Sequence, residues 1–142
     1  MSKLIYAAGA ITGLDFNENE AWRLQLKLKI EDITSHKWLV INPCQHISDD
    51  NLDPIQKEKE GMEWDLWKIR QCELIVCDFS HPNSIGTSWE LGLARELNIP
   101  VIGVYTQEKV DVHPWWKMTA MKICNNLDEL TMYLCEHFLG ED

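Results

Sequence analysis

The chain has 142 residues, about the size of one domain, and its 45% hydrophobic and 25% charged residues are typical of a folded globular protein. A formal net charge of −10 would repel a phosphate backbone, which argues against a nucleic acid polymer as partner. No stretch approaches the roughly 18 apolar residues of a membrane span, and charge follows the apolar N-terminal run too soon for a signal peptide. We therefore expect a single domain over residues 1–142, in the cytoplasm and without a membrane segment.

The cysteines and histidines show no pattern of a disulfide framework or a metal site. The five cysteines are odd in number, scattered and mostly within apolar runs, which favours reduced, buried thiols. The five histidines have no metal-ligand spacing. We therefore expect no bound metal.

Segments that predict strands alternate with segments that predict helices. In chain order they are the strand KLIYAAGA (3–10), a helix over 17–34, the strand WLVINP (38–43), a polar loop over 45–59, a helix over 59–72, the strand ELIVCDF (73–79), a helix over 88–98, the strand VIGVY (101–105), a short strand near MKIC (121–124) and a helix over 127–138. Because each parallel crossover needs a helix to return the chain, this order predicts an α/β fold, a doubly wound parallel sheet of about five strands with helices on both faces.

Polar stretches follow the predicted strands and should lie together at one edge of the sheet. They are AAGAITG, NPCQH, CDFSHPNSIGT and VYTQEK. Parallel sheets of this kind bind ligands at the carboxyl ends of their strands, so polar groups here are candidates for chemistry. GAITG contains glycines but lacks a dinucleotide fingerprint or a P-loop, so a tight turn is its simpler interpretation.

Glu90 lies on the apolar side of the helix predicted over 88–98, four residues before Ala94 and seven before Leu97. One interpretation is structural, because Thr-Ser-Trp-Glu at 87–90 fits the S/T-x-x-E capping box, in which the glutamate returns to the backbone N–H of the cap. From the pattern alone, capping is the stronger interpretation. The other is a catalytic anion, which the helix dipole favours in a first turn.

Asp65 also interrupts an apolar stripe, between Met62 and Ile69 on the helix predicted over 59–72. A charge there needs a partner or a function, unless the helix phase is shifted by one residue and Asp65 is solvated. Two carboxylates at one edge would form the pairing of acid with base or nucleophile that glycosyl transfer uses. Both interpretations of Asp65 stay open.

Three stretches in order, IYAAG, DLWKIRQCELIVCDF and SIGTSWELGLA, resemble the nucleoside 2-deoxyribosyltransferase family. The resemblance covers residues 4–104, and it is specific because each motif falls at a predicted strand end or adjoining helix. It implies a flavodoxin-like sheet and a nucleophilic glutamate in the GTxxELGxA stretch, which falls on Glu90. Such a glutamate attacks the anomeric carbon of a 2'-deoxynucleoside, expels the base and holds the sugar as an ester until a second base or water takes it.

The same resemblance implies roles for further residues. Tyr6 would orient the nucleophile through its phenol, and Asp65 would contact the leaving base and supply or relay its proton. Asp78 would bind or position the sugar, or would only cap the next turn, and these two roles are left open. The other substrate-binding candidates are Gly9, Gln45, Ser84, Gly86, Thr119 and Met121.

Ser84 departs from the pattern of many transferases, which carry an aspartate six residues before the nucleophile to hold the sugar 5'-hydroxyl. The related 2'-deoxynucleoside 5'-monophosphate N-hydrolases have a serine there, and a hydroxyl tolerates a phosphate dianion that a carboxylate repels. TAM at 119–121 also resembles a segment that those hydrolases lend from a neighbouring subunit. Against this, GAIT lacks the Ser and Arg of the hydrolases' first loop, and Tyr6 is transferase-like. We therefore favour a transferase that could accept 5'-monophosphates, with the hydrolase as the alternative.

Partners follow from the resemblance as well. The family builds its sites at subunit contacts, which implies a homo-oligomer assembled from dimers with shared sites. The substrates would be nucleosides, nucleobases and nucleoside 5'-monophosphates, with no cofactor. A non-catalytic nucleotide-binding sensor, in which Glu90 caps its helix, is the competing hypothesis from another class, and a structural interaction domain is a more remote one. The preference for purine or pyrimidine stays open.

Overall fold

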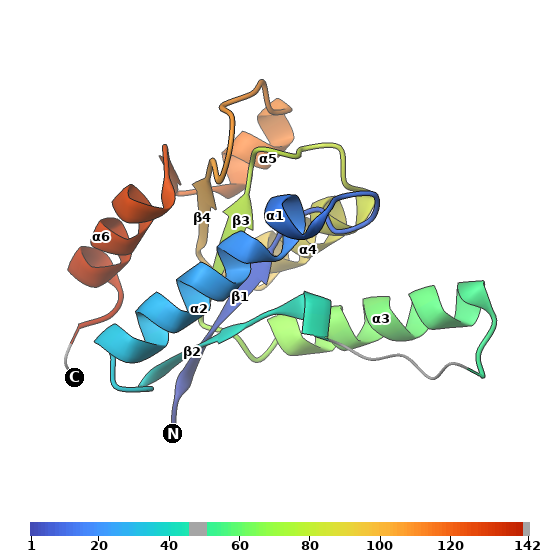
Figure 1. The fold of residues 1–142 in the computed structure, drawn as a ribbon, viewed down its shortest axis with the longest axis horizontal. Coiled ribbons are helices and arrows are strands. Elements are labelled where there is room, and N and C mark those ends of the chain that lie inside the picture. Colours follow the sequence, from blue (N-terminus) through green and yellow to red (C-terminus); the bar gives the residue numbers. More distant parts are fainter. Residues whose placement is uncertain (46–50, 141–142) are drawn as a thin grey trace.

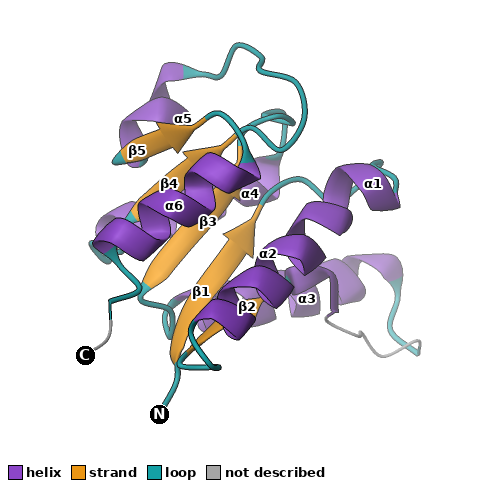
Figure 2. Cartoon of the chain, turned by 60° about the vertical axis from the view of Figure 1, so that its left-hand side comes forward, coloured by secondary structure: helices purple, strands orange, loops and turns teal. Residues whose placement is uncertain are grey.

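The computed structural model describes residues 1–45 and 51–140, and of Gln45 the backbone alone. Its centre is a parallel sheet in the order β2-β1-β3-β4-β5 (Figures 1 and 2). The strands are β1 (Lys3–Ala8), β2 (Trp38–Ile41), β3 (Leu74–Asp78), β4 (Val101–Val104) and β5 (Lys122–Cys124). A first strand between the second and third is the flavodoxin-like order, so the predicted fold class is confirmed.

Helices cover both faces of this sheet. Helices α2 and α6 pack on one face, and α3, α4 and the short α5 pack on the other (Figure 2). The helices are α1 (Phe16–Asn19), α2 (Ala21–Ile33), α3 (Pro54–Ile69), α4 (Ile85–Glu96), α5 (Pro114–Thr119) and α6 (Leu127–His137), with a 3-10 turn η1 (Pro43–Gln45). In the part of the chain that the structure describes, no helix is both long and apolar enough to cross a membrane.

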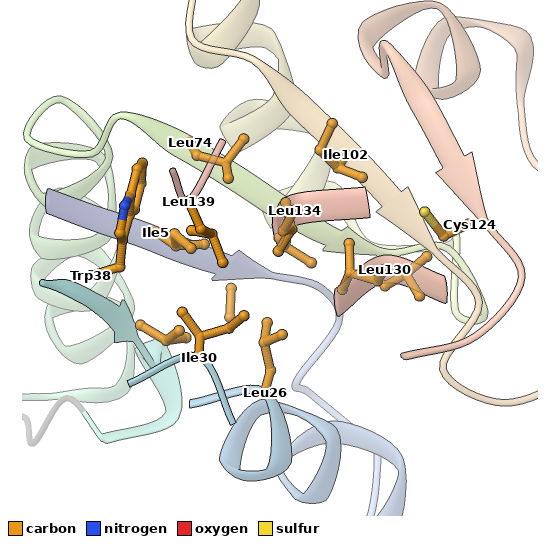
Figure 3. Close-up of a cluster of buried hydrophobic side chains, with 14 of the residues drawn as sticks. Ile5, Leu26, Ile30, Trp38, Leu74, Ile102, Cys124, Leu130, Leu134 and Leu139 are labelled. Atoms are coloured by element: carbon orange, nitrogen blue, oxygen red, sulfur yellow. The ribbon is translucent and has the colours of Figure 1, made fainter. Parts of the chain in front are cut away.

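Alternate strand residues feed two separate apolar cores. Ile5 and Ala7 of β1 face α2 and α6, in the cluster that Figure 3 shows around Leu26 and Leu130. Tyr6 belongs to the opposite core, beneath α3 and α4. Because β1 is a central strand, Tyr6 is fully buried, and its hydroxyl must find a hydrogen-bond partner on that side.

Helix α3 begins at Pro54, where the sequence pattern predicts a loop up to residue 59. The carboxylate of Asp53 accepts from the backbone N–H of Gln56 at 2.9 Å, and the Gln56 amide oxygen accepts from the Asp53 N–H at 3.4 Å. Proline at the first helical position suits this start, because its missing N–H would be unpaired there anyway. The predicted loop is therefore wrong in its last residues, which are helical.

Two further helix boundaries differ from the sequence pattern. The helix predicted over 17–34 is divided at Glu20 into α1 and α2, with Asp15 capping α1 through the N–H of Glu18. Helix α5 is not predicted at all. It begins at Pro114, and Nδ1 of His113 accepts from the backbone N–H of Trp115 at 3.1 Å. A histidine cap is unusual, which explains why the pattern gives no helix start there.

Candidate active site

Tyr6 and Glu90 meet at the carboxyl edge of the sheet. The Tyr6 hydroxyl donates to Oε2 of Glu90 at 2.5 Å, and both side chains are buried, Glu90 being 8% exposed. Among the described residues, no other group forms a hydrogen bond to this carboxylate. A short bond between a phenol and a carboxylate is charge-assisted and therefore strong. It fixes the orientation of Glu90 through one oxygen and leaves the other without a partner in the described chain.

Glu90 does not cap its own helix. Helix α4 begins at Ile85, and its N-cap is Ser84, whose hydroxyl oxygen accepts from the backbone N–H of Thr87 at 3.1 Å. The Thr87 hydroxyl also donates to this oxygen, at 2.8 Å. Glu90 therefore lies in the second turn of α4, too far along the helix to reach the cap. The capping-box interpretation is wrong, because the helix begins at Ile85 and not at residue 88, where the sequence pattern places its start.

A second carboxylate, that of Asp65, borders the same space. Asp65 is half-buried on α3, and its Oδ1 is fully buried with no hydrogen-bond partner among the described residues. Burial raises the pKa of Asp65 to about 6, although the Tyr6 hydroxyl and the charge of Arg23 lower it. A carboxylate with a raised pKa and one unsatisfied buried oxygen in a cavity wall is a candidate for contact with a ligand.

The pKa of Glu90 is raised as well, to about 7. Burial is the main cause and the negative charge of Asp65 adds to it, while the hydrogen bond from Tyr6 and the charge of Arg23 oppose them. Burial, and then the charge of Glu90, raise the pKa of Tyr6 far above its ordinary value, so the phenol stays a donor. Two neighbouring carboxyls with raised pKa values titrate as a coupled pair near neutral pH, so both the ionised and the acid form of a carboxyl are accessible in this site.

A cavity of about 870 Å³ opens onto Glu90 and Asp65. Its walls are the loop over residues 9–12 after β1, residues 55–66 of α3, and residues 83–90 at the start of α4. Cavities of a few hundred to about 1,000 Å³ are typical of small-molecule sites. Within the described ranges, no group of three or more His, Cys, Asp or Glu side chains could hold a metal ion.

A match between most of the sequence and one family model shows which family the chain belongs to. The family model described as nucleoside 2-deoxyribosyltransferase matches residues 5–131, most of the chain. The chain belongs to this family. The matched range includes Tyr6, Asp65 and Glu90, the three side chains that the fold brings together from β1, α3 and α4.

Solved structures similar to this deoxyribosyltransferase-family chain agree on the fold. A 2-deoxyribosyltransferase from Bacillus psychrosaccharolyticus has a TM-score of 0.69 at 13% identity, over 89% of each chain. A conserved protein from Enterococcus faecalis has a TM-score of 0.66 at 16% identity, over 94% of this chain and 100% of its own. A CMP N-glycosidase from Clostridium botulinum has a TM-score of 0.58 at 19% identity, over 93% of this chain and 100% of its own. Identities this low show the fold alone, and a sequence search of curated proteins gave no match.

Three further residues expected at a deoxyribosyltransferase-family site, Gly9, Ser84 and Gly86, line the cavity. Gly9 has a φ of 157°, and a side chain there would place its Cβ 3.1 Å from the Cβ of Asp78 and 3.2 Å from Nη2 of Arg23. The loop after β1 therefore needs glycine to pass this close to the core. Ser84 caps α4 through its hydroxyl, and the same residue lines the cavity.

Asp78 lies behind the cavity and outside its lining. Its buried carboxylate accepts from the backbone N–H of Ser80 at 2.8 Å and from the Thr106 hydroxyl at 2.9 Å, and it lies 3.0 Å from Nδ1 of His81. Nε2 of His81 in turn lies 3.5 Å from a carboxylate oxygen of Glu18. Of the two roles left open, these contacts favour the structural one, because they cap the turn after β3 and tie three strand-end loops together.

The remaining predicted residues lie outside this cavity or outside the part of the chain that the structure describes. Thr119 ends α5, where its hydroxyl donates to the carbonyl of Trp116 at 2.7 Å, and Met121 is exposed just before β5. Neither lines the cavity within one chain. The side chain of Gln45 lies outside the described part of the structure. The roles of these three residues stay predictions.

Arg23 is a residue near the site that the sequence pattern did not single out. It is fully buried on α2. Its place three residues before Leu26 and seven before Ile30 was a usable signal, because that spacing puts it on the apolar stripe of the helix. A charge on such a stripe needs a partner, as for Asp65.

Proposed function

We propose that the protein is a nucleoside 2'-deoxyribosyltransferase, which exchanges the base of 2'-deoxyribonucleosides through a covalent deoxyribosyl ester on Glu90. The observation that carries this proposal is the state of the Glu90 carboxylate. It is buried, held through one oxygen by Tyr6, not used to cap its helix, and open to a cavity that it shares with Asp65. Membership of the family supports the class of reaction.

The proposed reaction consists of two displacements at one carbon. In the first, an oxygen of Glu90 bonds to the anomeric carbon while the bond from that carbon to the base nitrogen breaks. The bonding pair leaves with the base, and Asp65 in its acid form supplies or relays a proton to it. In the second, a nitrogen of the acceptor base attacks the same carbon, loses its proton to Asp65 and releases Glu90 as a carboxylate. The two inversions restore the original configuration.

Burial of the carboxylates supports this chemistry physically. Positive charge develops on the sugar ring in each transition state, and a fixed anion stabilises that charge more strongly in a water-poor site than in bulk solvent. A pKa of about 6 leaves a usable fraction of Asp65 protonated near neutral pH. The Tyr6 hydroxyl orients Glu90 and favours its ionised form.

Base exchange tests the proposal. The protein is incubated with a 2'-deoxynucleoside and a different free base, and the products are separated by chromatography. The exchanged nucleoside supports transfer, free deoxyribose at every acceptor concentration supports hydrolysis, and binding without any product supports a sensor. Mass spectrometry after mixing with the nucleoside alone should find one added deoxyribosyl group, which Glu90→Ala should lack.

One observation favours a second candidate, a 2'-deoxynucleoside 5'-monophosphate N-hydrolase. Ser84 lines the cavity in place of an aspartate, and Lys57, Glu58 and Lys59 of α3 line it as well, with Lys59 3.7 Å from Glu63. A hydroxyl tolerates a phosphate dianion, which a carboxylate at position 84 would repel. The exchange experiment is therefore run with a deoxynucleoside and with its 5'-monophosphate.

We also propose a homo-oligomer assembled from dimers, in which a second copy covers the cavity. Helices α3, α4 and α5 lie side by side, and together they expose large apolar side chains, here named the apolar face, several of which line the cavity. They are Ile55, Met62, Trp67, Ile85, Trp89, Trp115 and Met118, with Met121 beside them. Side chains of this size contribute on the order of 100 Å² each, which together matches the roughly 800 Å² per partner of a standard interface.

The proposed substrates are small molecules, namely nucleosides, free bases and nucleoside 5'-monophosphates. Neither displacement needs a cofactor, because carboxylates and hydrogen bonds supply every proton and charge. All five cysteines are unpaired, as is usual in a reducing compartment. We therefore place the reaction in the cytoplasm.

A further inference from the structure

Arg23 reaches from the first turn of α2 to the end of β1, fully buried. Nε donates to the carbonyl of Ala7 and Nη2 to the carbonyl of Gly9, each at 2.9 Å. Nη1 donates to the carbonyl of Asn19 and lies 3.4 Å from Sγ of Cys44. In the ranges that the structure describes, no carboxylate forms an ion pair with this guanidinium.

A buried guanidinium without a paired carboxylate is unusual, because desolvation of a charge is unfavourable. Carbonyl dipoles offset part of this penalty, and the remaining positive field acts on Tyr6, Asp65 and Glu90, favouring the ionised form of each. The titratable groups around Glu90 are Tyr6 from β1, Asp65 from α3 and Cys77 from β3, while Cys44 and Glu20 lie in the field around Arg23. Arg23 is the cation of this group, and it opposes the mutual repulsion of the two carboxylates.

The same side chain holds the wall of the cavity. Its bonds to the carbonyls of residues 7 and 9 fix the chain where β1 passes into the loop over 9–12, and this loop lines the cavity. The guanidinium also lies over the ring of Trp22, 4.9 Å from the centroid, which limits its movement. Since Gly9 leaves space for Nη2 only by lacking a side chain, loop and guanidinium fit each other closely.

We propose that Arg23 is a positioning residue of this site, which ties the loop after β1 to α1 and η1 and places a fixed positive charge behind the wall of the cavity that Glu90 lines. It acts through Glu90 and through the cavity wall. The inference rests on the proposed role of Glu90 as nucleophile, but both effects can be measured without turnover.

Direct titration of Glu90 tests the charge. Carboxyl 13C NMR is recorded on the full chain for wild type, Arg23→Gln and Arg23→Met, with the Glu90 signal assigned by its loss in Glu90→Gln. Removing the positive charge should move the titration midpoint of Glu90 upward relative to wild type. Arg23→Lys keeps the charge and should stay near the wild-type midpoint. Arg70→Gln, at the exposed end of α3, removes the same charge elsewhere and should leave the midpoint unchanged.

Hydrogen exchange tests the attachment of the loop. A lysine cannot reproduce the planar fork that reaches three carbonyls, so in Arg23→Lys the amides over residues 9–12 should exchange at least ~10-fold faster than in wild type. The Arg70→Gln variant should show wild-type exchange in this segment. Circular dichroism establishes that each variant is folded before either measurement.

The outcomes separate this inference from the proposed function. An unmoved Glu90 midpoint in a folded neutral variant overturns the charge role, and unchanged exchange in Arg23→Lys overturns the attachment role. If neither neutral variant folds, the exchange result in Arg23→Lys decides the inference alone. If the Arg23 variants show both effects but wild type catalyses no base exchange, the proposed function is refuted. If wild type catalyses base exchange but the Arg23 variants show neither effect, only the role of Arg23 is refuted.

Discussion

The Tyr6 hydroxyl and Oε2 of Glu90 lie 2.5 Å apart, although 84 positions separate the two residues in the sequence. The bond joins the interior strand β1 to helix α4 on the side of the sheet that faces the cavity. Because both side chains are buried, the protonation of Glu90 is coupled to folding as well as to the proposed reaction. This coupling makes the role of Glu90 accessible to stability measurements.

Glu90→Gln should abolish activity and stabilise the fold at alkaline pH. An amide can still accept from Tyr6 but cannot attack a sugar, so base exchange should fall at least ~10³-fold. In the folded protein the pKa of Glu90 is about 7, above its ordinary 4.5, so the stability of wild type falls as pH rises through this window. Urea denaturation should give the variant about 2 kcal/mol of extra unfolding free energy at pH 8 and clearly less at pH 5.

Glu96→Gln is the matched control, because Glu96 is exposed at the end of the same helix. It should change neither base exchange nor the dependence of stability on pH. Equal unfolding free energies of wild type and Glu90→Gln at pH 8 would show that Glu90 is not held as a buried anion. A near-normal rate of base exchange in Glu90→Gln would remove it as the nucleophile.

Tyr6→Phe should move the acid limb of kcat/KM to higher pH. The hydrogen bond from Tyr6 lowers the pKa of Glu90, so its loss raises that pKa and leaves less carboxylate at neutral pH. We expect a loss of about 10- to 100-fold at pH 6.5, with partial recovery at pH 9. Tyr133→Phe on the remote helix α6 serves as the control. An acid limb at the wild-type position would show that Tyr6 does not tune Glu90.

Asp65→Asn should shift the acid limb in the opposite direction. The charge of Asp65 raises the pKa of Glu90, so its removal lets Glu90 ionise at lower pH. The maximal rate should still fall by about 10²- to 10⁴-fold, because the leaving base loses its proton donor. The measurement is the full pH profile of kcat and kcat/KM. Glu63→Gln, exposed on the same helix, should behave as wild type, and an unchanged rate in Asp65→Asn would exclude it as the acid.

The fold could be predicted because its signals are local and repeated. The segment of β3, Leu74–Asp78, is a continuous apolar run ending in one carboxylate, and every residue in it is buried, as a strand covered on both faces requires. The first residues of the helices were harder to predict from the sequence. Asp53 and Ser84 are both good cap residues, but a cap is recognised only when the helix phase is known, and polar residues nearby offer several phases.

The site was partly predictable for a different reason. Asp65 and Glu90 were detectable as charges on apolar stripes, which is a local anomaly. The bond between Tyr6 and Glu90 was not detectable from the pattern alone, because a tyrosine in a strand is ordinary and its partner depends on packing. Arg23 donates to main-chain carbonyls, which every residue has. The amino-acid types of its partners therefore do not reveal these contacts in the sequence.

Charges on the apolar face should dissociate the proposed oligomer. Trp115→Glu and Met121→Asp each place a carboxylate where we expect a second copy to pack, and an unpaired charge in an interface is strongly unfavourable. Light scattering after gel filtration should show a lower mass, with a matching loss of base exchange. Met132→Asp, exposed on α6 at the opposite face of the sheet, should keep the wild-type mass. Full activity in a monomeric variant would contradict shared sites.

Ser84→Asp should lower activity on 5'-monophosphates and spare activity on nucleosides. Aspartate caps helices as well as serine does, so α4 should keep its start, while the new carboxylate faces the cavity and repels a phosphate dianion. We expect the ratio of kcat/KM for a 5'-monophosphate to that for its nucleoside to fall at least ~10-fold, about 1.4 kcal/mol. Ser84→Asn has nearly the same shape and capping ability without the charge, and it should keep the wild-type ratio. An equal ratio in the two variants would place the phosphate away from Ser84.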